Sequence, residues 1–282
     1  MPELPEVEVT RLGLLPFIPG RRIAKISWSN KRLRTATPGK LLLQYIQGER
    51  VEIIDRRGKF LLFRMMNKSN MIIHLGMTGK LALLPAGTPR AKHDHLRLLL
   101  DNGKELRLND SRRFGSIAVW PPAESTRLEK LFSAGIGVEP LSDAFHPDYL
   151  KQLSVNKKQP VKTFLMDSRK VAGIGNIYAN EILFAAGVHP MTPVNRITRL
   201  GWEKIVVSTG KILRQAIQCG GSSISDFLGT SGNPGYFQVR FKVYNRSGEN
   251  CRHCGIPIHK SVIGGRATYF CPQCQAKKND ME

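Results

Sequence analysis

Four of the five cysteines in this 282-residue chain form two Cys-x-x-Cys pairs near its end, and no other pattern constrains the fold as strongly. The pairs are Cys251 with Cys254 and Cys271 with Cys274. Two such pairs at this separation supply four thiolates for a tetrahedral zinc site that has no open position for water. A redox dithiol is the alternative, but two matched pairs argue against it. The pattern therefore predicts a zinc ribbon around one structural Zn²⁺.

The segment between the two pairs predicts a hairpin. Ile263, Gly264, Gly265 and Arg266 have the composition of a tight turn with an arginine beside it. His253 and His259 lie in the same region, but four cysteines already complete the metal site. We expect Arg266 either to contact a pair of phosphates or to be an ordinary surface arginine without a partner.

The charge balance indicates a polyanionic partner. The chain has 43 Lys+Arg against 22 Asp+Glu, a net charge of +21 and a pI of about 10.1. Nucleic acid fits this surplus best. An anionic membrane surface fits less well, because no basic amphipathic helix with a bulky apolar face stands out and the apolar runs are too short for a bilayer. The acidic start is not a secretory signal, and metal-type cysteine spacing suits a reducing cytoplasm.

Residues 1–8, Met-Pro-Glu-Leu-Pro-Glu-Val-Glu, combine a nucleophile with acids. Removal of Met1 would give Pro2 a free secondary amine, which titrates near pH ~8 and is partly unprotonated at neutral pH. Such an amine condenses with an aldehyde carbon to an iminium, an electron sink for elimination. Glu3 would place a carboxylate beside it for acid/base work. Pro5 and Glu6 fit the first turn of a helix, and the alternative is that the segment merely starts a surface helix.

The periodicity predicts an α+β chain. Residues 20–120 resemble strands of an antiparallel two-sheet sandwich or flattened barrel, with a turn over residues 55–59 and an Asn-Gly hairpin at residues 101–104. Helical periodicity begins at about residue 149. We expect a β-sandwich domain over 1–135 and a helical domain over 136–235, whose stretch from about 220 to 235 is Gly-rich. A zinc finger with four cysteine ligands would follow over 236–282.

Two predicted loops carry candidate DNA-contacting residues. Arg112 and Phe114 lie two residues apart, and Met77 follows a strand. An enzyme that extrudes a base must fill the hole, and an apolar wedge with a guanidinium would do so. The alternative for each of these residues, taken alone, is an ordinary position in the core or on the solvated surface. Asn176 precedes an apolar helix, where it would either bind an anion at the helix N-terminus or act as a plain N-cap.

These motifs together resemble the formamidopyrimidine-DNA glycosylase / endonuclease VIII family, and the leucine at position 4 favours its formamidopyrimidine branch, whose members act on 8-oxoguanine and cleave abasic sites. The match follows the chain order and spans nearly all of it. Its motifs are residues 1–8, 57–60, 74–79, 110–115, 173–181 and the four cysteines.

The resemblance implies a fold and a reaction. The fold is an N-terminal β-sandwich with an N-terminal helix, a helical domain with a helix–two-turn–helix motif, and a zinc ribbon. In the reaction, Pro2 attacks C1′ of the lesion nucleotide and Glu3 assists as acid/base. The Schiff base then drives β- and δ-elimination, which leaves a one-nucleotide gap. The stretch at 220–235 corresponds to the loop that caps the lesion.

Residue roles follow position by position from the resemblance. Glu6 matches an acid near the nucleophile, and Lys59 matches a turn lysine that contacts the lesion strand and contributes to catalysis. The residues matching phosphate contacts are His74, Asn176 and Arg266. The residues matching the inserted wedge are Met77, Arg112 and Phe114. The implied partner is double-stranded DNA with oxidised purines or abasic sites. The implied protein is a monomer in the bacterial cytoplasm that associates with the nucleoid and does not bind a membrane.

Two rival interpretations stay open on the sequence. One is endonuclease VIII-like activity on oxidised pyrimidines, against which Leu4 and the pair Arg112 and Phe114 argue. The other is a non-catalytic DNA-binding or damage-sensing protein, in which the start of the chain is incidental.

Overall fold

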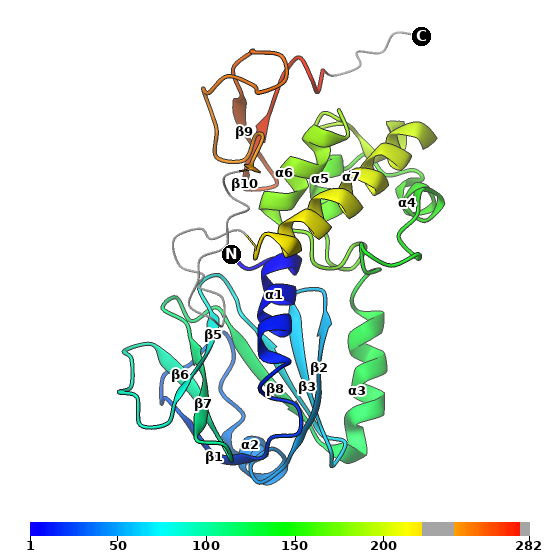
Figure 1. Cartoon of the computed structure of the whole chain (residues 1–282). Coiled ribbons are helices and arrows are strands. Elements are labelled where there is room, and N and C mark those ends of the chain that lie inside the picture. The colour runs from blue at the N-terminus through cyan, green and yellow to red at the C-terminus, as the bar shows by residue number, and fades with distance from the viewer. Residues whose placement is uncertain (222–239, 277–282) are drawn as a thin grey trace. The chain divides into compact units, whose positions relative to one another are not determined.

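Two antiparallel sheets of four strands form the framework of the N-terminal part (Figure 1). The computed structural model of the protein describes residues 1–221 and 240–276. These fall into two units: unit 1 contains residues 1–135 and 217–221, and unit 2 contains residues 136–216 and 240–276. The described ranges omit residues 222–235, so most of the predicted lesion-capping stretch lies outside them.

Unit 1 has one sheet in the order β1-β6-β7-β5 and another in the order β2-β3-β4-β8. All neighbouring strands are antiparallel. The strands are β1 (Ile23–Trp28), β2 (Val51–Arg57), β3 (Phe60–Met65), β4 (Asn70–His74), β5 (Lys80–Pro85), β6 (Asp94–Leu100), β7 (Lys104–Asn109) and β8 (Ser116–Trp120). The predicted antiparallel sandwich and the α+β class are confirmed.

Apolar side chains from both sheets and the first helix make up the core of unit 1. Leu96, Leu98 and Leu100 alternate along β6, as expected for a strand with one buried face. Helix α1 (Leu4–Leu14) adds Val7 and Leu14 to the same core. Burial of these side chains therefore fixes the helix that carries the N-terminus onto the sandwich.

The turn between β2 and β3 is shorter than predicted. Arg57 pairs with Phe60, so only Gly58 and Lys59 form the turn, and the expectation of a turn over residues 55–59 was wrong. Asp55 and Arg56 are polar strand residues because each has an ion-pair partner, Arg64 for Asp55 and Glu8 for Arg56. Composition alone suggested a loop, whereas pairing allows these charges inside a strand.

Two further helices cover unit 1. Helix α2 (Gly39–Tyr45) contacts β1 and β8, and α3 (Pro122–Ala134) packs on β8. Phe132 of α3 meets Phe60 and Trp120 edge to face, with ring centroids 5.0 and 5.3 Å apart. This contact explains why the sheet of β2, β3, β4 and β8 has apolar residues on its outer face as well.

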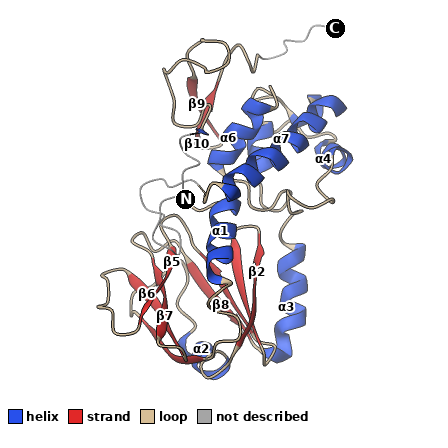
Figure 2. Ribbon diagram, viewed as in Figure 1, coloured by secondary structure: helices blue, strands red, loops and turns tan. Residues whose placement is uncertain are grey.

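Unit 2 combines helices with a two-stranded ribbon (Figure 2). Its elements are α4 (Pro147–Ser154), α5 (Val161–Met166), α6 (Asn176–Ala185), the 3₁₀ turn η1 (Val194–Arg196), α7 (Arg199–Gln218, which belongs to unit 2 up to Ala216), β9 (His259–Ile263) and β10 (Arg266–Phe270). Helix α6 packs against both α5 and β10, and most of its residues are buried. Among the described helices, none has the length and apolar character needed to cross a membrane.

Candidate active site and nucleic-acid interface

The start of α1 holds its acidic residues in one defined arrangement. Glu3 is the N-cap, and it forms a reciprocal capping box with Glu6: the Glu6 carboxylate accepts from the Glu3 amide at 2.9 Å, and the Glu3 carboxylate accepts from the Glu6 amide. Both side chains are 1% exposed. The box therefore fixes the backbone immediately after Pro2.

Pro2 itself is buried, whereas Met1 is 37% exposed. While Met1 is attached, the Pro2 nitrogen is a tertiary amide that carries no hydrogen, and its lone pair is delocalised into the carbonyl. Removal of Met1 converts it into a secondary amine next to Glu3. The arrangement supports nucleophilic chemistry only in the processed chain.

Ion pairs connect α1 to the hairpin that carries Lys59. Glu8 accepts from Arg11 at 2.6 Å and from Arg56 at 2.8 Å, and Arg56 also donates to the carbonyl of Gly58 at 3.0 Å. Burial acts to raise the pKa of Glu8, but the hydrogen bonds from Arg11 and Arg56 outweigh it and hold this pKa below its usual value. The charged network thus joins the helix with the predicted nucleophile to the turn with the predicted lysine.

His74 ends β4 directly opposite Phe60, the residue after Lys59. Its Nδ1 accepts from the Gly76 amide at 3.0 Å, so the ring proton of the neutral form lies on Nε2. Burial, followed by the charges of Lys59 and Arg34, lowers the pKa of His74 to about 4. At neutral pH this residue can donate one hydrogen bond to a phosphate but brings no charge.

The depressed pKa of His74 predicts a pH-dependent stability. The His74 ring of the unfolded chain takes up a proton below pH ~6.5, whereas the ring of the folded chain takes one up only below about 4. The contribution of neutral His74 to the free energy of unfolding is therefore complete above pH ~6.5 and is lost as the pH falls towards 4. We expect the free energy of unfolding to fall across this window by up to about 1.4 kcal/mol per pH unit. Urea unfolding at several pH values measures it, and His74→Gln should flatten the slope. If the free energy of unfolding changed with pH equally in the wild type and in His74→Gln, the low pKa assigned to His74 would be contradicted.

The three predicted wedge residues lie in two loops of unit 1. Met77 follows β4, and Arg112 and Phe114 lie between β7 and β8. Phe114 is 44% exposed, and the Arg112 guanidinium lies 4.9 Å from the centre of its ring. A Cβ on Gly76 would overlap the backbone of Phe114, so the two loops touch. The structure therefore places the two loops that carry the predicted wedge residues against each other.

Asn176 and Arg266 are brought together in unit 2. Asn176 is the first residue of α6, and its side-chain amide donates to the Ala267 carbonyl at 3.0 Å. The N-cap is Gly175, so the interpretation of Asn176 as a plain N-cap was wrong. The Gly175 backbone is extended, which is the usual conformation of an N-cap residue. Arg266 is exposed directly beside Ala267, at the end of the β9–β10 turn.

Lys162 is a buried residue beside Asn176 and Arg266 that the sequence did not single out. Its side chain is fully buried, and Nζ donates to the Ala267 carbonyl at 2.9 Å and to the Thr268 hydroxyl at 2.7 Å. Asn180 adds a bond from the Tyr269 amide at 2.8 Å. These contacts hold β10 on α5 and α6. A buried lysine has no pattern of its own, and only its partners reveal its role.

The four predicted zinc ligands converge in unit 2. Their sulfur atoms all lie within 4.8 Å of one another, with Cys251 3.9 Å from Cys274 and Cys254 3.4 Å from Cys271. A tetrahedral site with Zn–S bonds of about 2.3 Å needs sulfur separations near ~3.8 Å. The donor set fits one structural zinc, which would hold the ribbon together and supply no catalytic position.

Glu181 is a buried residue at the end of the 173–181 motif, and the sequence alone indicated no role for it. Its carboxylate accepts from the amides of Lys242, Val243 and Tyr244 at 2.8–2.9 Å. Burial raises the pKa of Glu181, and the three backbone donors act against this. The carboxylate thereby fixes the segment leading into the ribbon onto α6.

Replacing Glu181 by Gln is expected to destabilise unit 2 by about 2–4 kcal/mol, because one amide donor loses its charged acceptor and the new NH₂ faces backbone N–H groups. Thermal and urea unfolding measure the loss. Glu249→Gln is the matched control, since Glu249 is 57% exposed in its ion pair with Arg246. We expect that control to change stability by less than about 1 kcal/mol. Equal effects of the two substitutions would contradict the role of Glu181.

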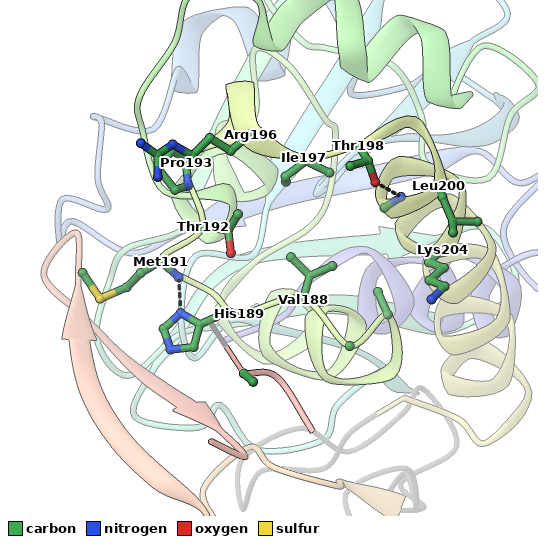
Figure 3. A pocket seen from close by; sticks show the side chains of 14 residues that line it. Val188, His189, Met191, Thr192, Pro193, Arg196, Ile197, Thr198, Leu200 and Lys204 are labelled. Atoms are coloured by element: carbon green, nitrogen blue, oxygen red, sulfur yellow. Dashed lines mark hydrogen bonds between the residues drawn. The ribbon is translucent and has the colours of Figure 1, made fainter. Parts of the chain in front are cut away.

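A pocket of about 460 Å³ opens between the end of α6 and the start of α7 (Figure 3). His189, Arg196 and Lys204 contribute to its wall, and His189 Nδ1 accepts from the Met191 amide at 3.2 Å. None of the predicted site residues lines this pocket. The predicted chemistry therefore does not take place there.

Comparison with known proteins matches three family domains in chain order. Residues 1–117 match the formamidopyrimidine-DNA glycosylase N-terminal domain, residues 136–228 match the H2TH domain of the same enzyme, and residues 248–277 match the zinc finger found in FPG and IleRS. The three matches together cover most of the chain.

Full-length relatives and solved structures agree with these matches. The formamidopyrimidine-DNA glycosylase of Idiomarina loihiensis is 44% identical over 275 residues, which is 98% of this chain and all of the relative. Two Lactococcus lactis FPG structures are 34% identical and cover 98% of this chain and all of theirs. One is a mutant with Fapy-dG containing DNA, with a TM-score of 0.90, and the other is a complex with abasic-site DNA, with a TM-score of 0.89. This chain therefore belongs to the formamidopyrimidine-DNA glycosylase family.

Proposed function

We propose that this chain is a bifunctional DNA glycosylase and abasic-site lyase of base excision repair, which removes oxidised purines such as 8-oxoguanine and formamidopyrimidines. The observation that carries the proposal is the capping box of Glu3 and Glu6, which fixes Pro2 at the start of a buried helix. Family membership and the damaged DNA bound by the two Lactococcus lactis structures support it.

In the proposed reaction, the lone pair of the Pro2 amine attacks C1′ while the bond from C1′ to the base breaks and its electrons leave with the base. Glu3 takes up the proton released by the Pro2 nitrogen and passes it to the ring oxygen as the bond from C1′ to that oxygen breaks, which leaves a cationic iminium between Pro2 and C1′. Loss of the C2′ proton then expels the 3′ phosphate, and a second elimination expels the 5′ phosphate. Water hydrolyses the remaining Schiff base, which releases the sugar fragment and regenerates the Pro2 amine. Glu6 positions Glu3 through its backbone amide.

Other residues would bind and deform the DNA. Lys59 and His74 lie on neighbouring strand ends of unit 1 and would contact the lesion strand. Asn176 and Arg266 would grip phosphates from unit 2. Met77, Arg112 and Phe114 would fill the gap that the extruded nucleotide leaves.

We also propose three functional segments: a catalytic sandwich over 1–135, a helical segment over 136–235 with the lesion-capping stretch, and a zinc finger over 236–282. A bacterial cytoplasmic location beside the nucleoid follows from the DNA substrate and from cysteines that bind metal as thiolates. We expect the enzyme to act as a monomer.

The test is excision by the processed protein from matched duplexes that carry 8-oxoguanine, a formamidopyrimidine or thymine glycol. We expect rapid release of the two purine lesions, with strand cleavage that leaves phosphates on both sides of the gap. Preference for thymine glycol would instead support endonuclease VIII-like activity. Binding to every duplex without base release would leave only a damage-sensing protein.

Affinity for DNA should fall steeply with salt, because each lysine or arginine on a phosphate releases counterions. We expect Arg266→Gln to reduce the slope of log affinity against log salt by about 1. Fluorescence anisotropy with an uncleavable abasic duplex measures it. Lys68→Gln is the control, because Lys68 is 72% exposed in the β3–β4 turn, at the opposite strand ends from Lys59 and His74. A flat salt response would contradict phosphate binding.

A further inference from the structure

Asp110 is the buried first residue of one of the two loops that carry the wedge residues. We call these loops the wedge loops: residues 76–79, with Met77, and residues 110–115, with Arg112 and Phe114. Asp110 is fully buried, whereas Phe114 is 44% exposed. No part of the proposed reaction uses this carboxylate.

The Asp110 carboxylate bonds to both wedge loops. One oxygen accepts from the Thr78 hydroxyl at 2.5 Å, and the other accepts from the Gly115 amide at 2.8 Å. The Thr78 hydroxyl in turn accepts from the Arg112 amide at 3.1 Å. Thr78 and Asp110 thus form one continuous chain of hydrogen bonds from the first loop into the second.

The sheet fixes the backbone of Asp110 from below. His95 of β6 is 1% exposed, and its Nε2 donates to the Asp110 carbonyl at 3.0 Å. Its Nδ1 accepts from the Ser29 hydroxyl at 2.8 Å, and the Asp110 amide donates to the His93 carbonyl at 3.0 Å. The carboxylate therefore has a fixed origin in the sandwich.

One wedge loop has a backbone conformation that needs external support, and the other packs closely against it. Arg113 has φ +58, which is unfavourable for any residue that carries a Cβ. Gly76 has φ +66, and any Cβ there would overlap the backbone of Phe114. The conformation of Arg113 persists only where the surroundings over-determine it, and the bonds of Asp110 and Thr78 do so here.

We propose that Asp110 and Thr78 act as a latch, a pair of positioning residues that holds Met77, Arg112 and Phe114 in one preorganised wedge. This inference rests on the proposed function. A wedge on two independent loops would have to be ordered while the duplex is opened, at a cost in conformational entropy. The latch meets that cost when the protein folds, so insertion is faster without any contact between the latch and the DNA.

The latch predicts a split between two substrates. A lesion in a duplex needs the wedge, whereas an abasic site in a single strand has no partner base to support and no stack to fill. Thr78→Val keeps the shape of the side chain but removes its hydroxyl. We expect it to slow single-turnover excision of 8-oxoguanine from a duplex by about tenfold, which corresponds to one hydrogen bond, and to leave elimination at a single-stranded abasic site within about twofold.

Three more variants sharpen the experiment. Thr78→Ser keeps the hydroxyl and should retain the wild-type rate on the duplex. Asp110→Asn should slow the duplex reaction, and its combination with Thr78→Val should be no slower than the slower single variant, because both break one chain. Ser111→Ala is the matched control, since Ser111 is an exposed hydroxyl residue of the same loop.

The readouts separate the latch from the proposed function. A 2-aminopurine base beside the lesion reports wedge insertion by its fluorescence, and thermal unfolding verifies that each variant is folded. Wild-type rates for Thr78→Val on the duplex, or an equal loss on duplex and single strand, would overturn the latch while leaving the glycosylase intact. Absence of 8-oxoguanine excision by the wild-type protein would overturn the proposed function instead.

Discussion

Protein that retains Met1 is expected to form no covalent adduct when borohydride is added to its reaction with an 8-oxoguanine duplex, whereas processed protein forms one quantitatively. The reason lies in the Pro2 nitrogen. With Met1 attached it is a tertiary amide without a usable lone pair, and without it the same atom is a secondary amine beside the capping box of Glu3 and Glu6. Mass spectrometry of the N-terminus, read beside the adduct yield, measures both quantities in one sample.

Pro2→Gly tests the same amine in processed protein. Glycine supplies a primary amine on a more mobile backbone, and its Schiff base can lose the N–H proton and become a neutral imine, whereas the iminium of Pro2 stays cationic. We expect excision to fall by about three orders of magnitude or more, as for the loss of an activated nucleophile. The affinity for an uncleavable abasic duplex should stay within about twofold of wild type, because Pro2 takes part in the reaction and does not contribute to DNA binding. Unchanged excision in either preparation would remove Pro2 from the mechanism.

Removing the zinc is expected to abolish specific DNA binding while the β-sandwich stays folded. Structural zinc contributes about 10–16 kcal/mol of apparent folding free energy in small zinc-binding segments, so the apo ribbon should unfold. Lys162 and Asn176 would then lose the Ala267 carbonyl of the hairpin as a fixed hydrogen-bond acceptor. Among the residues that the structure describes, the core of unit 1 contains none from the ribbon, so its strands should persist.

Cys254→Ser makes this loss permanent, and Cys219→Ser is its control because Cys219 lies outside the four-sulfur cluster. We expect the Cys254 variant to lose at least about 100-fold in affinity for an abasic duplex and to contain less than one equivalent of zinc. Anisotropy, metal analysis and far-UV circular dichroism give the three readouts. Wild-type affinity in protein shown to lack metal would remove the ribbon, and Arg266 with it, from the DNA interface.

The sequence alone was sufficient where the determinants are close together in the chain. Each pair of zinc ligands lies within one turn, and the Asn-Gly hairpin, the acidic start of α1 and the glycine pair before Arg266 are set by neighbouring residues. The strand-like runs of residues 20–120 likewise predicted the antiparallel strands of the sandwich. Local backbone preference and side-chain periodicity decide such features, so a pattern can reveal them.

The tertiary structure decided which buried polar residues work together. Lys162 bonds to residues 105 and 106 positions away, and Asp110 bonds to Thr78 across 32 positions. Asp55 and Arg56 suggested a turn until their partners Arg64 and Glu8 showed them to be strand residues. A buried charge is stable only when a specific partner compensates its desolvation, and the position of that partner depends on how distant segments pack. Periodicity determined where the strands and helices lie, but only packing determined the partners of Lys162, Asp110 and Glu181.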